Sequence, residues 1–215
     1  MPISLEQLNG KLLQRIQVVD NAFERHVASP ALKYRVDKNA LQAGLISFLW
    51  QSWSDFCREV ILGSVQGAVT KSGQQTTSPH SARTSAEIAF VAKQLANSHP
   101  VNQVRTLSGR HVEPSWGDPA KLNLITTGIG VSNAPSLSSA FGVLSQVEDL
   151  RLCRNACAHT NRESLSQLAS TRVRYGDTKL HHPSDMMFWS DPATNDFAWK
   201  AWVDEMACVA EFAIV

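Results

Sequence analysis

The chain has 215 residues, of which 43% are hydrophobic and 18% are charged. That is enough apolar material for one ordinary core, so we expect a single domain over residues 1–215. The 20 basic and 19 acidic residues leave a net charge of +1. This near-neutral balance excludes a protein that holds nucleic acid by bulk charge, but it leaves room for a local basic patch.

The cysteines, the N-terminal segment and the lack of a long apolar run lead us to expect a soluble, cytoplasmic protein with no membrane contact. Cysteines occur at Cys57, Cys153, Cys157 and Cys208, all in apolar, helix-like segments. We expect buried free thiols there, because such cysteines pack as small hydrophobic groups. The absence of a disulfide framework favours a reducing compartment. The N-terminal segment lacks the layout of a signal peptide, and the most apolar stretch, residues 45–62, is interrupted by charges.

Two long helices are predicted in the first third of the chain. In the first, apolar residues recur in steps of three and four until Ser29-Pro30, which indicates one face of an amphipathic helix. A second long helix is predicted over residues 36–69. The positions expected on the two apolar faces are Leu5, Leu8, Leu12, Ile16, Val19, Phe23 and Val27 in the first helix and Leu41, Leu45, Phe48, Leu49, Trp53, Phe56, Val60 and Val65 in the second.

Shorter elements are predicted in the middle of the chain. Residues 70–84 are polar and nearly free of large apolar groups, which is typical of a surface loop or a poorly ordered insert. A third helix is predicted over residues 85–96. Asp118 and Pro119 supply an N-cap and a proline at the first helical position, so a short helix should begin there and end near residues 128–130.

The C-terminal part is predicted to hold two further helices. Helical spacing of apolar residues begins at Ser136 and continues to His159, and a final helix is expected from about residue 192 to the end. Residues 172–190 are too rich in turn formers for a prediction. The whole pattern predicts an all-α, up-and-down bundle with about four long helices, short helices and an irregular insert. The tryptophans are expected in its core or at a dimer interface.

The candidate catalytic residues lie in the stretch Arg154-Asn155-Ala156-Cys157-Ala158-His159. His159 is predicted near the C-terminus of its helix, a position that favours a protonated imidazole. A histidine that changes charge near neutral pH can move a proton during cleavage of an RNA phosphodiester. A neighbouring arginine can hold the phosphate and its developing charge. This reaction requires no metal ion.

The same stretch resembles the signature of the HEPN superfamily of ribonucleases, and of RiboL-PSP-type domains in particular: arginine, a polar residue, a short spacer and then histidine. The resemblance implies a helical bundle that homodimerises and places two copies of the motif across a shared cleft. It also implies metal-independent cleavage of RNA without a cofactor, often as a toxin or phage-defence module restrained by an antitoxin or another regulatory partner. Arg154 would then bind the scissile phosphate, His159 would act as acid and base, and Asn155 would orient them.

Three acidic residues are candidates for a supporting role. Glu148 and Asp149 lie one to two turns before Arg154 and can position its guanidinium, although many helices carry such acids for solubility. Asp55 lies, with Glu59, in the upstream region where members of the resembled family often place a further polar active-site residue.

A local excess of basic residues surrounds the motif, where a phosphate backbone would lie. The RNA-binding candidates are Arg151, Arg162, Arg172, Arg174 and Lys179, together with Tyr175, whose ring can stack on a base. A solvated surface next to a loop is the competing interpretation of the same charges.

The motif also allows interpretations other than a nuclease site. A metal site at Cys153, Cys157 and His159 is disfavoured, because a fourth ligand and paired short-spaced cysteines are both lacking. The histidine can also simply cap the carbonyls of its helix. The main alternative function is a non-catalytic HEPN-type module that binds RNA, a nucleotide or a partner protein, and a structural adaptor is the third.

Overall fold

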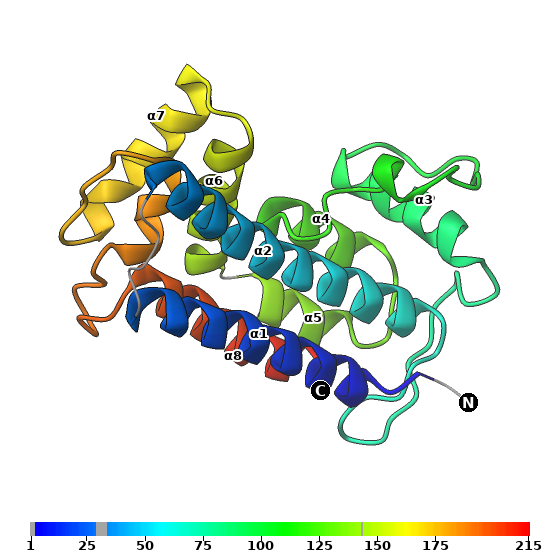
Figure 1. The fold of residues 1–215 in the computed structure, drawn as a ribbon. Helices are drawn as coiled ribbons and strands as arrows, with labels where there is room; N and C mark the ends of the chain where they lie inside the picture. The colour runs from blue at the N-terminus through cyan, green and yellow to red at the C-terminus, as the bar shows by residue number, and fades with distance from the viewer. Residues whose placement is uncertain (1–2, 29–33, 143) are drawn as a thin grey trace. The chain divides into compact units, whose positions relative to one another are not determined.

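The computed structural model describes residues 3–28, 34–142 and 144–215 (Figure 1). In these ranges the chain forms helices, turns and isolated β-bridges, and the all-α prediction is confirmed. The α-helices are α1 (Leu5–Ala28), α2 (Arg35–Val65), α3 (Ser85–Ala96), α4 (Pro119–Gly128), α5 (Ala134–Phe141), α6 (Ser145–Ala158), α7 (Arg162–Ser170) and α8 (Ala198–Ala213). Short 3-10 helices are η1 (Arg110–Val112), η2 (Thr171–Arg174) and η3 (Pro183–Phe188). No helix among the described residues is long and apolar enough to cross a bilayer.

Helices α3 and α4 lie where the sequence predicts them, and each begins at a capping side chain. The Thr84 side chain accepts a hydrogen bond from the Glu87 backbone N–H and begins α3. The Asp118 carboxylate accepts from the backbone N–H groups of Ala120 and Lys121 and begins α4. The predicted end of the first helix at Ser29-Pro30 lies outside the described residues.

The prediction of one continuous helix from Ser136 to His159 is wrong. Helix α5 ends at Phe141, Leu144 has non-helical backbone angles (φ −125°, ψ 73°), and α6 begins at Ser145. The carboxylate of Glu205, on α8, accepts hydrogen bonds from the backbone N–H groups of Ser145 (3.1 Å) and Val147 (2.7 Å). A carboxylate at this position satisfies N–H groups of a first helical turn that have no partner inside the helix.

The last helix begins at Ala198, not near residue 192. A tight turn occupies the intervening segment: the backbone N–H of Asn195 donates to the Asp191 carbonyl, and that of Asp191 donates to the Asp196 carbonyl. Asn195 has a positive φ of 61°, which asparagine tolerates better than most residues. The turn therefore delays the helix by about six residues relative to the expectation.

The described chain divides into two compact units. The first contains residues 1–13, 53–143 and 208–215, and the second contains residues 14–52 and 144–207. The helices α1, α2 and α8 each contribute residues to both units.

The first unit is built around Trp53, which is fully buried. Its ring packs against those of Phe56 and Phe141, and its indole N–H donates to the Gly117 carbonyl (3.3 Å). The polar segment 70–84 forms a surface loop held to this unit by Thr76, whose buried hydroxyl lies 2.8 Å from the Ser64 carbonyl.

The second unit contains an aromatic cluster centred on Phe23 of α1. Its ring stacks on Phe188 (5.8 Å between centroids) and on Trp199 (4.9 Å), and it meets Phe197 edge to face (5.9 Å). All the tryptophans of the chain are buried, which confirms their expected place in the core.

Some apolar side chains lie on the surface, contrary to the prediction. Leu41 and Phe48 of α2 are 42% and 49% exposed, although the helical pattern placed them on the apolar face. Val27, at the end of α1, is also exposed. Cys208 is exposed as well, so the expectation of four buried thiols is wrong for this residue. Apolar spacing predicts a helix, but it does not determine which of several apolar positions is covered.

A buried chain of hydrogen bonds joins α1, α2 and η3 within the second unit. Gln42 is fully buried, and its amide nitrogen lies 3.0 Å from Nε2 of His26. The Ser184 hydroxyl donates to the amide oxygen of the same Gln42 (2.8 Å). Because the Gln42 amide nitrogen can only donate, His26 must accept at Nε2, which requires a neutral imidazole.

Because His26 must be neutral to accept from Gln42, we expect the stability of the protein to depend on pH. Burial, followed by the charge of Lys38, lowers the pKa of His26 below its ordinary value of 6.5. The folded protein thus binds this proton more weakly than the unfolded chain, so the free energy of unfolding falls as the pH drops through 6.5. Urea unfolding between pH 7.5 and 5.5 should show a shallower fall for His26→Gln than for the parent protein. His181→Gln, at an exposed position, is the control and should keep the parental slope; equal slopes in all three proteins contradict the assignment.

Candidate functional site

The motif lies at the C-terminal end of α6, in the second unit. Arg154 and Asn155 occupy the last turn and are half-buried, and the Arg154 guanidinium donates to the Asn155 amide oxygen (3.1 Å). His159 is the first residue beyond the helix and is exposed. The structure thus brings all three expected catalytic residues to one helix end, with Asn155 in contact with the arginine.

The backbone at His159 is fixed from both sides. Its N–H donates to the Asn155 carbonyl (2.8 Å), although its φ and ψ of −134° and 76° are not helical. Its carbonyl accepts from the Asn161 N–H (2.7 Å) and from the hydroxyl of Ser164, which is buried. Asn161 and Ser164 together form the capping box of α7, so the start of one helix holds the residue that ends the previous one.

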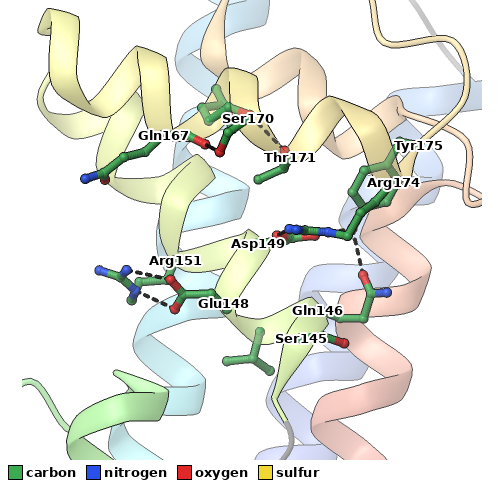
Figure 2. Close-up of polar contacts among 12 residues, drawn as sticks. Ser145, Gln146, Glu148, Asp149, Arg151, Gln167, Ser170, Thr171, Arg174 and Tyr175 are labelled. Carbon is green, nitrogen blue, oxygen red and sulfur yellow. Dashed lines mark hydrogen bonds and ion pairs between the residues drawn. The ribbon is translucent and has the colours of Figure 1, made fainter.

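The two acidic residues of α6 contact other arginines than Arg154. Glu148 makes a bidentate pair with Arg151, at 2.6 and 2.7 Å. Asp149 points to the other side of the helix, as Figure 2 shows, and its carboxylate pairs with the guanidinium of Arg174. The expected positioning of Arg154 by these carboxylates is therefore not what the structure displays.

Asp149 is the most deeply buried charge near the motif, with a side chain only 1% exposed. Besides Arg174, it accepts a hydrogen bond from the Tyr175 hydroxyl (2.7 Å), which also lies 2.7 Å from the Gln146 amide oxygen. Burial raises the pKa of the Asp149 carboxyl, and the hydrogen bond from Tyr175 and the charge of Arg174 oppose this rise. Burial, followed by the charge of Asp149, raises the pKa of the Tyr175 hydroxyl.

Tyr175 therefore anchors the segment after η2. Its hydroxyl is bound to Asp149, and its ring packs against Trp189 at 5.8 Å between centroids. The side chain is half-buried in this arrangement. Stacking on an RNA base would have to compete with both contacts.

The basic residues around the motif fall into two groups. Arg151, Arg174 and Lys179 are paired with Glu148, Asp149 and Asp177, respectively. Arg162, at the start of α7, and Arg172, on η2, are exposed. The carboxylates in these ion pairs offset part of the positive charge of the basic residues.

The remaining candidates lie elsewhere or lack a metal-binding arrangement. Asp55 belongs to the first unit, where its carboxylate pairs with the Arg110 guanidinium (3.0 Å). Among the described residues, no group of three or more histidine, cysteine, aspartate or glutamate side chains is arranged to hold a metal ion.

Sequence reasoning missed two residues that shape the site. Ser164 clamps the His159 carbonyl, and the Asn161-x-x-Ser164 spacing of a capping box was the available signal. Glu205 caps the start of α6 from a position 60 residues away in the chain, and no local pattern marks such a contact.

Compared with models of protein families, with curated proteins and with solved structures, the chain matches none.

We expect the two neighbouring carboxylates of α6 to differ in their effect on stability. Asp149→Ala leaves the Tyr175 hydroxyl and the Arg174 guanidinium without their buried acceptor and should lower the free energy of unfolding by about 1–3 kcal/mol. Glu148→Ala removes a half-exposed ion pair and should cost at most about 1 kcal/mol. Urea denaturation followed by circular dichroism measures both, and a larger loss for Glu148→Ala would overturn this ranking.

Proposed function

We propose that the protein is a metal-independent endoribonuclease of the HEPN type. The observation that carries the proposal is the arrangement at the end of α6: a half-buried arginine held by Asn155, followed by an exposed histidine whose backbone is clamped on both sides. Such an arrangement suits a reaction in which the guanidinium must keep its place while the imidazole reaches the substrate.

In the proposed reaction, His159 removes the proton from the 2′-hydroxyl or supplies one to the leaving oxygen. Arg154 binds the non-bridging phosphate oxygens and offsets the negative charge that develops on them. Asn155 accepts from the guanidinium and so limits its orientations. A homodimer would place two copies of this arrangement across one cleft, and an antitoxin or another regulatory partner would restrain a toxin or phage-defence module of this kind.

The proposal predicts RNA cleavage that survives EDTA and requires both residues of the motif. Arg154→Ala and His159→Ala should each lower the cleavage rate by roughly 100-fold or more, because each removes charge stabilisation or proton transfer from the transition state. Gel analysis of a mixed RNA substrate measures this. His181→Ala, an exposed histidine in the same unit, is the matched control and should cleave like the parent protein.

Two controls make a negative result informative. Circular dichroism should show the same helix content in each variant, and light scattering should give the mass of a dimer. Intact RNA in every sample of a folded dimer would reject the nuclease and favour the non-catalytic binding module.

RNA binding should depend more on Arg172 than on Lys179. Arg172 is exposed, whereas Lys179 shares its charge with Asp177 (3.4 Å). In a His159→Ala background, which prevents turnover, Arg172→Gln should weaken RNA binding several-fold and lower the salt-dependence slope by about 1. Lys179→Gln should have the smaller effect in the same fluorescence-anisotropy titration. Equal effects of the two substitutions, or none, would contradict a role for η2 in holding the phosphate backbone.

A further inference from the structure

The motif contains a thiol that the proposed reaction does not use. Cys157 lies between Asn155 and His159 in the last turn of α6 and is half-buried. A second thiol, that of Cys153, lies one turn earlier and is fully buried. Residues four apart on a helix share a face, so these two thiols are neighbours.

The two thiols have different surroundings. Cys153 is covered by η3, and its thiol donates to the Pro183 carbonyl (3.4 Å). Burial raises the pKa of the Cys153 thiol, and the neighbouring Cys157 thiol adds to that rise. Cys157 is only half-buried, and Arg154 lies three residues before it on the same helix.

We propose that Cys157 is a site of reversible oxidation by hydroperoxides, with Cys153 as the thiol that closes a disulfide. Of the two thiols of α6, that of Cys157 is only half-buried and can meet the oxidant, whereas Cys153 is fully buried one turn earlier on the same face, where it can attack the oxidised sulfur. The regulatory consequence of this chemistry rests on the proposed nuclease function.

The chemistry takes place in two balanced steps. The Cys157 sulfur attacks one peroxide oxygen, the O–O bond breaks, and a sulfenic acid and water form from the thiol and hydrogen peroxide. The Cys153 sulfur then attacks the Cys157 sulfur, the S–O bond breaks, and the departing hydroxide takes the Cys153 proton as water. Altogether, two thiols lose two electrons and two protons, and one hydrogen peroxide becomes two waters.

Closing this disulfide would deform the end of α6. Cβ atoms at positions i and i+4 of a helix are about 5–6 Å apart. A disulfide requires about 3.5–4.5 Å between them. The last turn is the part of α6 that can yield, because Cys157 lies one residue before its end. The bonds at risk include those from the His159 N–H to the Asn155 carbonyl and from the Thr160 hydroxyl to the Ala156 carbonyl. Oxidation would thus displace His159 relative to Arg154 and lower cleavage.

Mass spectrometry of the full chain tests the chemical step directly. Trypsin cleaves after Arg151, Arg154 and Arg162, so Cys153 and Cys157 fall in separate peptides, residues 152–154 and 155–162. After treatment with hydrogen peroxide, we expect these two peptides to be joined in the parent protein and in the control Cys208→Ser, and to separate on reduction with dithiothreitol. In Cys153→Ala, dimedone should label Cys157, because the sulfenic acid has no thiol to close on.

The outcomes separate this inference from the proposed function. Oxidation confined to Cys208, with peptides 152–154 and 155–162 never joined and no dimedone label on Cys157, overturns the inference whatever the protein does to RNA. If RNA cleavage is present, peroxide should lower it at least tenfold in the parent protein, reductant should restore it, and Cys157→Ser should resist peroxide. Undiminished cleavage by the disulfide form overturns the regulatory consequence. Joined peptides in a protein that leaves RNA intact under all conditions support the modification site and reject the nuclease.

Discussion

The buried carboxylate of Asp149 is the contact on which the surroundings of the motif depend. It lies on the inward side of α6 and binds both a guanidinium from η2 and the hydroxyl of Tyr175. The ring of Tyr175 in turn packs against Trp189, whose indole N–H donates to the Lys179 carbonyl (3.0 Å). These contacts link one buried charge to the segment from η2 to Trp189, which contains 3-10 helices and no α-helix. A buried carboxylate without partners would cost free energy, so the contacts to Asp149 keep Arg174 and Tyr175 in place.

The helix that carries the motif is satisfied at both ends by residues outside it. Glu205 accepts from its first N–H groups, and the connection to α7 binds its last residues. Arg154 consequently has the fixed geometry of a helical residue, whereas His159 has non-helical backbone angles and its carbonyl is held by the α7 capping box. The two proposed catalytic side chains are therefore positioned by different parts of the fold.

The sequence predicts those features of this fold that depend on neighbouring residues. Periodic apolar residues were enough to locate α3, the cap at Asp118 was enough to locate α4, and the six-residue motif was enough to identify the end of α6 as a candidate site. The failures involve distant partners. Nothing local indicates that Glu205 would start a new helix at Ser145, or that Asp149 would bind an arginine 25 residues later instead of Arg154. The apolar pattern also did not predict which side chains of α2 are buried. Leu41 and Leu45 both fit the pattern, but only Leu45 is buried.

The short connection between α6 and α7 has a consequence for how this chain can vary. Only residues 159–161 separate the two helices, and the side chains of Asn161 and Ser164 bind across that connection. One additional residue there would turn α7 by about 100° relative to the contacts that begin it, and the His159 carbonyl would lose its acceptor role toward Ser164. The side chains of residues 159–161 are exposed, but the number of residues in the connection is set by the contacts across it. The structure therefore constrains the length of this connection as well as the identities of Asn161 and Ser164.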